Sequence, residues 1–196
     1  MHESTTTIGI LPGSRESEIE RLLPTLLKGC EILHEALEGR VQFILAKSPA
    51  LRPDLYETML KRFPLPISLV EGKPYDVIRV SDFLFVCSGT ATLETAILGK
   101  PMLILYKVGN LSWFLFKPLV RIPNIGLANV VAGERVVPEL LQFEAHPRRI
   151  AQETLAILRD PARLKKITEA WASVKLKLGT PGASRRAAEM VRSTLS

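Results

Sequence analysis

Two short segments of the sequence carry residues suited to binding an anion. Each one, Leu11–Arg15 and Cys87–Ala91, joins an apolar run to a helical pattern through small or polar residues. Gly13 and Gly89 let a ligand approach the backbone closely. The N–H groups at a helix start, together with the positive end of the helix dipole, suit a phosphate, and Arg15 adds a planar guanidinium that can hold two phosphate oxygens. The phosphate site predicted from these segments consists of Gly13, Ser14, Arg15, Ser88, Gly89 and Thr90.

Neither segment matches a standard nucleotide-binding motif. The sequence contains no Gly-x-x-x-x-Gly-Lys and no Gly-x-Gly-x-x-Gly. Turns of the strand–glycine–helix type are common, so the prediction depends on finding two of them in one sheet. Glu94 lies four residues after Thr90 on the same helix face, where a carboxylate could accept hydrogen bonds from a ribose. The alternative is an acidic residue that the helix dipole favours near the helix start.

The elements that would position these residues alternate between strands and helices. Apolar runs predict five strands, at Thr7–Leu11, Val41–Ala46, Ile67–Val70, Phe83–Cys87 and Met102–Tyr106. Helical spacing predicts helices at Ile19–Leu37, Pro53–Arg62, Tyr75–Val80 and Thr90–Leu98, with Pro24 kinking the first or marking a fresh start within it. Nearly continuous apolar strands indicate a parallel sheet that is covered on both faces. The predicted fold class is α/β, a Rossmann-like doubly wound parallel sheet, whose ligands bind at the carboxyl ends of the strands.

The alternation of strands and helices fails beyond Tyr106. The very apolar segment Leu111–Ile122 is followed by a loop that runs through Gly133. Additional C-terminal helices are then predicted at Pro147–Arg159, Ala162–Leu178 and Ala183–Leu195. We therefore divide the chain into a sheet-containing part, residues 1–145, and a helical part, residues 146–196.

Composition narrows the class of protein. With 196 residues, 46% hydrophobic and 23% charged, the chain suits a single globular domain with a substantial core. No apolar run approaches the roughly 20 residues of a spanning helix, and the first seven residues show no apolar region of a secretory signal. The two cysteines, Cys30 and Cys87, are expected to be buried thiols in a reducing cytoplasm. His2, His34 and His146 are expected to have structural or solvent-facing roles.

The net charge of +6 is concentrated near the C-terminus. Residues 146–196 contain 11 Lys and Arg against 4 Asp and Glu, so they carry a net +7, and the rest of the chain carries −1. This excess is either a solvated helix face or a surface attracted to an anionic partner. No nucleic-acid-binding motif is present, so nucleic acid is not an expected partner.

Four motifs follow one another along the chain: Leu-Pro-Gly-Ser-Arg at 11–15, Ser-Gly-Thr-Ala-Thr-Leu-Glu at 88–94, Ala-Asn-Val-Val-Ala-Gly at 128–133 and Val-Pro-Glu-Leu-Leu-Gln at 137–142. In this order they resemble lipid-A-disaccharide synthase, a bacterial family of GT-B glycosyltransferases built from two Rossmann domains. The resemblance runs from about Thr7 to the C-terminus and covers the C-terminal half of that family. Other GT-B enzymes share the first two motifs in looser form. The last two motifs, interpreted as an Asn-containing loop and a helix, narrow the resemblance to this one family.

The resemblance implies a site for a UDP-sugar in residues 1–145. The diphosphate would face the two glycine-containing segments, Glu94 would hold the ribose, and the uracil would meet backbone near Glu71 and Gly72. Asn129 would lie in the donor cleft, with Glu139 and Gln142 at its border. Where the family usually has Pro-Asn-Leu-Leu-Ala-Gly, this chain has Ala128, which could make the loop less rigid. The implied donor site comprises Gly13, Ser14, Arg15, Glu71, Gly72, Ser88, Gly89, Thr90, Glu94, Asn129, Glu139 and Gln142.

The resemblance also implies an activity. The family transfers 2,3-diacylglucosamine from its UDP derivative, UDP-2,3-diacylglucosamine, to the acceptor lipid X. No cofactor is expected, and no metal is expected at the diphosphate, since the chain has no Asp-x-Asp motif. In the family the acceptor pocket and catalytic base belong to an N-terminal domain, so no residue here is assigned a catalytic role. The chain alone is expected to be inactive, and residues 146–196 are expected to pack on residues 1–145 or on that domain.

Two alternatives stay open at this stage. One is another GT-B enzyme that uses a UDP-sugar, either the peptidoglycan N-acetylglucosaminyl transferase or a UDP-sugar epimerase. The other is a non-catalytic half-protein that binds a UDP-sugar beside a separately encoded acceptor subunit. Two protein partners are considered. One is a second copy of this chain, and the other is a separate subunit that corresponds to the N-terminal half of the family.

The segment Leu111–Ile122 is a candidate for membrane contact. It is too short to span a bilayer, and it is either a helix buried under the sheet or an interfacial helix. The resemblance favours the second, because the family acts on lipids at the inner face of the cytoplasmic membrane. The residues expected to contact lipid or acyl chains are Trp113, Phe114, Phe116, Lys117 and Arg121.

Overall fold

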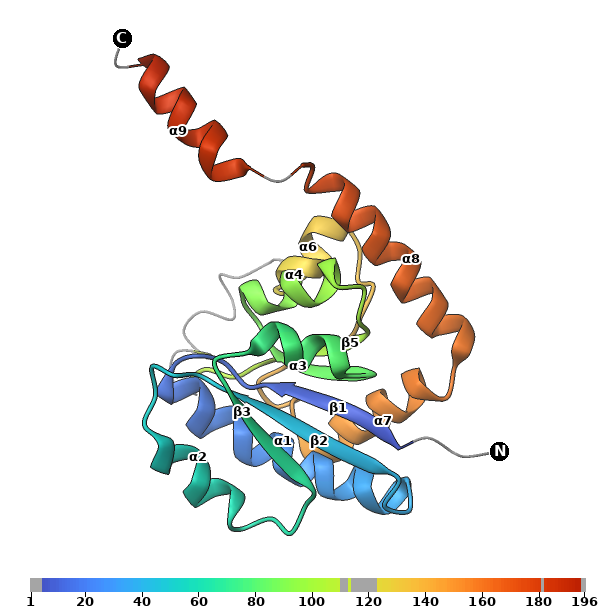
Figure 1. The fold of residues 1–196 in the computed structure, drawn as a ribbon. Coiled ribbons are helices and arrows are strands. Elements are labelled where there is room, and N and C mark those ends of the chain that lie inside the picture. The colour runs from blue at the N-terminus through green and yellow to red at the C-terminus, as the bar shows by residue number, and fades with distance from the viewer. Residues whose placement is uncertain (1–4, 110–112, 114–122, 181, 195–196) are drawn as a thin grey trace.

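A parallel sheet of six strands forms the centre of the chain (Figure 1). The computed structural model describes residues 5–109, 113, 123–180 and 182–194. The strand order is β3-β2-β1-β4-β5-β6, which is the doubly wound order of a Rossmann fold. The strands are β1 (Thr6–Leu11), β2 (Val41–Lys47), β3 (Ile67–Glu71), β4 (Phe83–Cys87), β5 (Met102–Tyr106) and β6 (Glu139–Leu141).

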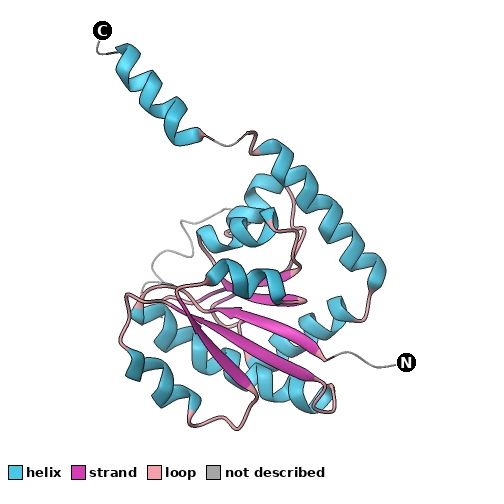
Figure 2. Cartoon of the chain, viewed as in Figure 1, coloured by secondary structure: helices cyan, strands magenta, loops and turns pink. Residues whose placement is uncertain are grey.

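Helices cover both faces of the sheet, as the nearly continuous apolar strands require (Figure 2). One face carries α1 (Glu16–Ala36), α2 (Pro53–Leu60) and α7 (Pro147–Leu158). The other carries α3 (Pro74–Val80), α4 (Thr90–Ile97), α6 (Leu127–Ala132) and α8 (Pro161–Lys177). The α/β, Rossmann-like fold class predicted from the sequence is therefore confirmed.

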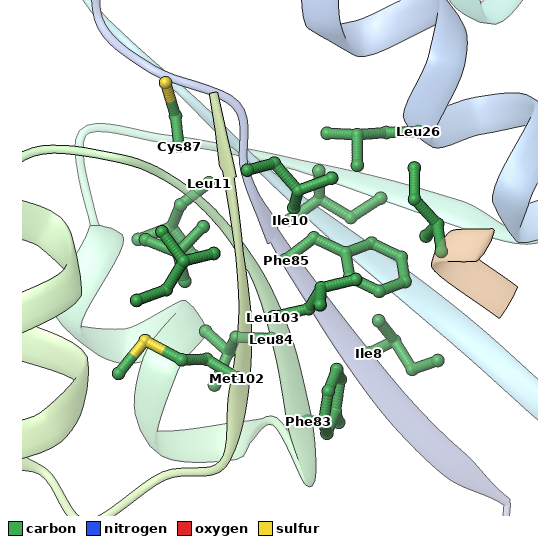
Figure 3. Packing of buried hydrophobic residues seen from close by; sticks show 14 of the residues in the cluster. Ile8, Ile10, Leu11, Leu26, Phe83, Leu84, Phe85, Cys87, Met102 and Leu103 are labelled. Atoms are coloured by element: carbon green, nitrogen blue, oxygen red, sulfur yellow. The ribbon is translucent and has the colours of Figure 1, made fainter. Parts of the chain in front are cut away.

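The core is densest where β1 and β4 pair at the centre of the sheet. Every residue of β4 is buried, and its pairing with β1 aligns Ile8 with Phe83 and Ile10 with Phe85. These four side chains lie on the face toward α1, where Ile10 lies beside Leu26 (Figure 3). Apolar packing on both faces fixes the sheet, so the carboxyl ends of its strands form a rigid edge.

The C-terminal helices differ in how they contact the sheet-containing part. α7 packs along α1, and α8 packs on α4 and α6. The Trp171 ring of α8 is almost completely buried, and its Nε1 donates a hydrogen bond to the Lys100 carbonyl at 3.0 Å. By contrast, α9 (Ala183–Thr194) has no buried residue and extends away from the other helices (Figure 1). No helix within the described ranges is both long and apolar enough to cross a membrane.

Two local predictions were wrong, and one of the two alternatives given for Pro24 is excluded. α1 runs without interruption through Pro24, so no fresh helix starts there. The segment at 137–142, predicted as a helix, contains the strand β6, which adds a sixth strand to the five expected. Residues 127–132, predicted as a loop, form α6. The segments at 137–142 and 127–132 are both too short for periodicity to decide between helix and strand. At 137–142, pairing with β5 determines that the segment forms a strand.

Candidate functional site

A cleft of about 280 Å³ opens at the carboxyl ends of β1, β2 and β4. It lies where the strand order reverses between β1 and β4, which is the position at which α/β sheets bind ligands. Seven of the residues predicted for the donor site line it together. They are Gly13, Ser14, Gly72, Ser88, Gly89, Thr90 and Glu94.

The α4 end of this cleft presents backbone N–H groups for which the described residues supply no acceptor. Among the described residues, none accepts a hydrogen bond from the N–H groups of Gly89, Thr90 and Ala91. The neighbouring Ser88 is fixed, because its N–H donates to the Leu105 carbonyl at 2.8 Å. A Cβ at Gly89 would meet no atom within 4 Å, so the space in front of this backbone is open. Converging N–H groups at a helix start form a site for an anion.

The α1 end of the cleft is arranged differently. The Glu18 carboxylate accepts hydrogen bonds from the N–H groups of Ser14 at 3.0 Å and Arg15 at 3.3 Å. The same carboxylate also pairs with the Arg15 guanidinium at 2.9 Å. This capping box satisfies the helix start from within the chain. An acidic side chain therefore holds the groups that the sequence assigned to a phosphate.

Arg15 and Glu71 lie outside the lining of the cleft. The Arg15 side chain is 80% exposed and its guanidinium is engaged by Glu18. Glu71, at the end of β3, forms an ion pair of 2.8 Å with Lys47, whose side chain is 8% exposed. Lys47 and the following Ser48 do line the cleft, and sequence reasoning missed them. The signal was available, since a lysine that ends a buried strand lies at the ligand-binding edge of the sheet.

Glu94 lines the cleft and is bound by Tyr75, which itself lies outside the lining. The Tyr75 hydroxyl donates a hydrogen bond to the Glu94 carboxylate at 3.2 Å. The negative charge of Glu94, followed by this hydrogen bond, raises the pKa of Tyr75, so its hydroxyl keeps its proton at neutral pH. The carboxylate keeps three further lone-pair positions for a ligand. Tyr75 is thus a third residue, after Lys47 and Ser48, that the sequence pattern did not indicate, and it acts through its contact with Glu94.

Cys87 lines the cleft but is not suited to act as a nucleophile. Burial of the side chain, followed by the charge of Glu18, raises the pKa of the Cys87 thiol to about 12, and Arg15 lowers it to a smaller extent. Only the thiolate is strongly nucleophilic. Cys30 is fully buried in α1, where burial raises its thiol pKa well above the usual value. Both cysteines are free thiols, as the sequence predicted.

Asn129 and Glu139 lie in a buried hydrogen-bond network and do not line the cleft. The Glu139 carboxylate accepts from the N–H groups of Ile125 at 2.8 Å and Gly126 at 3.1 Å, and from Asn129 Nδ2 at 2.8 Å. The carbonyl of Ile125 in turn accepts a hydrogen bond from Ser88 Oγ at 3.2 Å. The network therefore fixes the segment against which the cleft residue Ser88 is held.

Two further motif residues have similar structural contacts. Gln142 is buried, and its side-chain amide both accepts from the Val108 N–H and donates to the Val108 carbonyl, each at 3.0 Å. Ala128 is buried in α6, where its N–H donates to Thr92 Oγ1 at 3.4 Å. A proline at 128 has no N–H and could not form this bond. The replacement in this motif thus provides one additional contact to α4.

Two other predictions concern sites outside the cleft. No group of three metal-ligating side chains comes together in the part of the chain that the structure describes. Of the segment predicted to contact membrane, only Trp113 is described, and it is half-buried. Phe114, Phe116, Lys117 and Arg121 lie outside the described residues.

Comparison with known proteins places this geometry in a family. The sequence profile described as Lipid-A-disaccharide synthetase matches residues 1–193. The Lipid-A-disaccharide synthase of Syntrophus aciditrophicus is 45% identical over 191 residues, which cover 97% of this chain and 50% of that protein. The enzyme of Geobacter sulfurreducens is 42% identical over 184 residues, covering 94% and 48%. The chain spans about half the length of the curated relatives it matches.

Solved structures show the same fold at low sequence identity. The S. aureus MnaA–UDP co-structure superimposes with a TM-score of 0.66 at 16% identity, covering 99% of this chain and 46% of that one. The UDP-GlcNAc 2-epimerase of Neisseria meningitidis, bound to UDP-GlcNAc, gives a TM-score of 0.55 at 18% identity, covering 98% and 45%. At such identities the likeness establishes a shared fold.

Proposed function

Since this chain belongs to the lipid-A-disaccharide synthase family, we propose that it forms the UDP-sugar-binding half of a glycosyltransferase of lipid A synthesis. The observation that carries the proposal is the set of N–H groups of Gly89, Thr90 and Ala91 at the topological switch point, which have no acceptor among the residues that the structure describes. These groups and the α4 dipole would hold the diphosphate. They act electrostatically on the leaving UDP without a metal.

The rest of the nucleotide would extend from α4 across the cleft toward β3. Glu94, one turn into α4, would accept hydrogen bonds from the ribose hydroxyls, and its bond to Tyr75 holds the carboxylate in place. The uracil would lie near Gly72, whose φ of 68° turns the chain back at the cleft wall. Lys47 supports this wall through its ion pair with Glu71.

The reaction that we propose for the complete enzyme, of which this chain forms one half, is transfer of 2,3-diacylglucosamine from UDP to lipid X. This chain would supply donor binding, and the acceptor and catalytic base would be held by the part of the relatives' length that it does not span. A location at the inner face of the cytoplasmic membrane is part of the proposal, supported by the net +7 charge of residues 146–196.

Calorimetric titration of this chain with UDP and with uridine tests the proposal. We expect UDP to bind, and a transfer assay with the donor and acceptor to show no turnover by this chain alone. Glu94→Gln should weaken both ligands by roughly tenfold, because both carry the ribose and a hydrogen bond to a charged group contributes about 1.5–3 kcal/mol. Glu57→Gln, at an exposed position on α2, is the matched control. Absence of UDP binding at millimolar concentration would overturn the proposal.

A further inference from the structure

A second hollow lies at the same edge of the sheet, beyond β4. Its volume is about 310 Å³, and it is formed by α1, the turn after β5 and the turn after β6. Its lining includes two cationic side chains, Arg21 from α1 and Lys107 from the residue after β5. No residue of the nucleotide cleft lines it.

No acid among the described residues balances either cation of this hollow. The Lys107 ammonium donates a hydrogen bond of 2.8 Å to the neutral Thr25 hydroxyl, and in the described part of the chain no carboxylate forms an ion pair with Lys107 or Arg21. Burial alone lowers the pKa of Lys107, with no carboxylate to offset it. Lys47 differs from Lys107 in this respect, because its buried side chain is paired with the Glu71 carboxylate. A half-buried cation without a counter-charge is costly unless a ligand supplies one.

The hollow has a fixed floor. The reciprocal hydrogen bonds between the Gln142 amide and the Val108 backbone tie the turn after β6 to the turn after β5. Gln142 holds this position with a φ of 49°, an uncommon conformation for a residue with a side chain. Lys107 is thus presented from a braced turn, so little ordering is needed when a ligand binds.

We propose that this hollow binds a phosphate monoester group through Arg21 and Lys107, at a site separate from that of the nucleotide. A phosphate monoester carries about −1.5 to −2 charges at pH 7, so it can balance both cations. A carboxylate ligand, with a single negative charge, would balance only one of them. The Thr25 hydroxyl accepts its hydrogen bond from Lys107 and keeps its own proton to donate to a phosphate oxygen. The two anion sites would then flank the N-terminal half of α1. The proposal does not depend on UDP binding in the first cleft.

Two-dimensional NMR of this chain, titrated with inorganic phosphate, tests the site directly. The amides of Val108 and Gly109 report on the hollow, and those of Gly89 and Thr90 report separately on the nucleotide cleft. We expect saturable shifts at Val108 and Gly109 that persist with UDP present, and about tenfold weaker phosphate binding in both Arg21→Gln and Lys107→Gln. Lys28→Gln, at an exposed position of the same helix, should change the affinity by less than twofold.

The controls separate the site from general charge effects. Sodium chloride at equal ionic strength should leave the Val108 and Gly109 amides unshifted. Arg21 is exposed, so Arg21→Gln keeps the test decisive if Lys107→Gln fails to fold. An Arg21→Gln variant that binds phosphate as the parent does, or shifts that chloride reproduces, would overturn the proposal. Loss of UDP binding with intact phosphate shifts would overturn only the nucleotide site.

The source of the phosphate is resolved by a second experiment. Vesicles containing phosphatidic acid, which has a phosphate monoester headgroup, are compared with phosphatidylcholine vesicles in a sedimentation assay. If the natural ligand is a lipid headgroup, the parent should bind the phosphatidic acid vesicles at least fivefold more than Arg21→Gln, and inorganic phosphate should compete. If the ligand is a soluble phosphate compound, the two proteins should sediment equally while the NMR shifts remain. Absence of both the shifts and the vesicle difference would overturn the proposal.

Discussion

The helix starts of α1 and α4 lie at the same edge of the sheet and carry similar sequences, yet only one is prepared for a ligand. At α4 the N–H groups of Gly89, Thr90 and Ala91 have no acceptor among the described residues. At α1 the corresponding groups of Ser14 and Arg15 donate to the Glu18 carboxylate. Small residues before a helix therefore do not by themselves mark an anion site. The side chain three positions into the helix decides whether the site is already filled.

The two glycines at these starts differ in the same way. Gly13 has a φ of 113°, and a Cβ there would lie 2.3 Å from a Glu18 carboxylate oxygen. Gly89 has an extended φ of 161° and open space around it. Gly13 is thus required by the fold of the α1 start, whereas Gly89 leaves room that a ligand can occupy.

The largest effect is expected from Gly13→Ala. The substitution forces a side chain into a rarely populated backbone conformation and against Glu18, so the free energy of unfolding should fall by about 1–3 kcal/mol. Urea denaturation followed by circular dichroism measures the change. Gly89→Ala is the control and should stay within about 0.5 kcal/mol of the parent. Equal losses in the two variants would mean that the two helix starts do not differ as described.

Gly89→Ala, which should leave stability unchanged, is expected to weaken the binding of UDP. The added methyl group lies where the diphosphate would approach the backbone, so UDP should bind about tenfold more weakly while uridine is affected much less. Calorimetry with both ligands measures the difference. If UDP affinity is retained, the diphosphate does not contact the α4 start.

The smallest effect, and the most discriminating, is expected from Glu18→Gln. Glutamine can still cap the helix, but loss of the negative charge removes repulsion of the diphosphate, so UDP should bind about two- to fivefold more tightly. Cys87 should also be alkylated faster at a given pH, because the Glu18 charge contributes to the raised pKa of that thiol. Glu16→Gln, an exposed change of the same charge at the same helix start, is the control. Weaker UDP binding in Glu18→Gln would show that this carboxylate supports the nucleotide.

Most of the sheet could be predicted from the sequence, because its strands are long apolar runs between turn residues. β4 was predicted with its observed bounds, since all five of its residues face apolar neighbours. β6 could not be recognised, because it has only three residues and begins with the charged residue Glu139. The Glu139 carboxylate is buried, where it accepts hydrogen bonds from the N–H groups of Ile125 and Gly126. Local sequence does not indicate these contacts, because only the folded chain brings the two segments together.

The candidate site was predicted where local sequence decides the geometry. Gly89, Thr90 and Glu94 follow from one strand–turn–helix unit, and they do line one cleft. Arg15 was placed wrongly although the competing carboxylate of Glu18 lies only three residues further on, at the spacing of a capping box that the sequence analysis did not consider. Lys47 was missed although it directly follows the predicted strand Val41–Ala46. Tyr75 was missed because its hydrogen bond to Glu94 joins two helices, and local spacing does not show that these helices lie together.

The pairing of β1 with β4 at the centre of the sheet has a consequence for how the chain unfolds. This seam joins two segments whose aligned residues, such as Ile8 and Phe83, are far apart in the sequence, and the cleft lined by Gly13 and Gly89 opens across its end. Closing so long a loop makes the contact slow to form. A ligand that contacts both Gly13 and Gly89 therefore bridges the two halves of the sheet. At a free concentration of a hundred times its dissociation constant, such a ligand stabilises the folded state by about 2.7 kcal/mol. The increase in the free energy of unfolding therefore measures how much ligand is bound at the end of the β1–β4 pair.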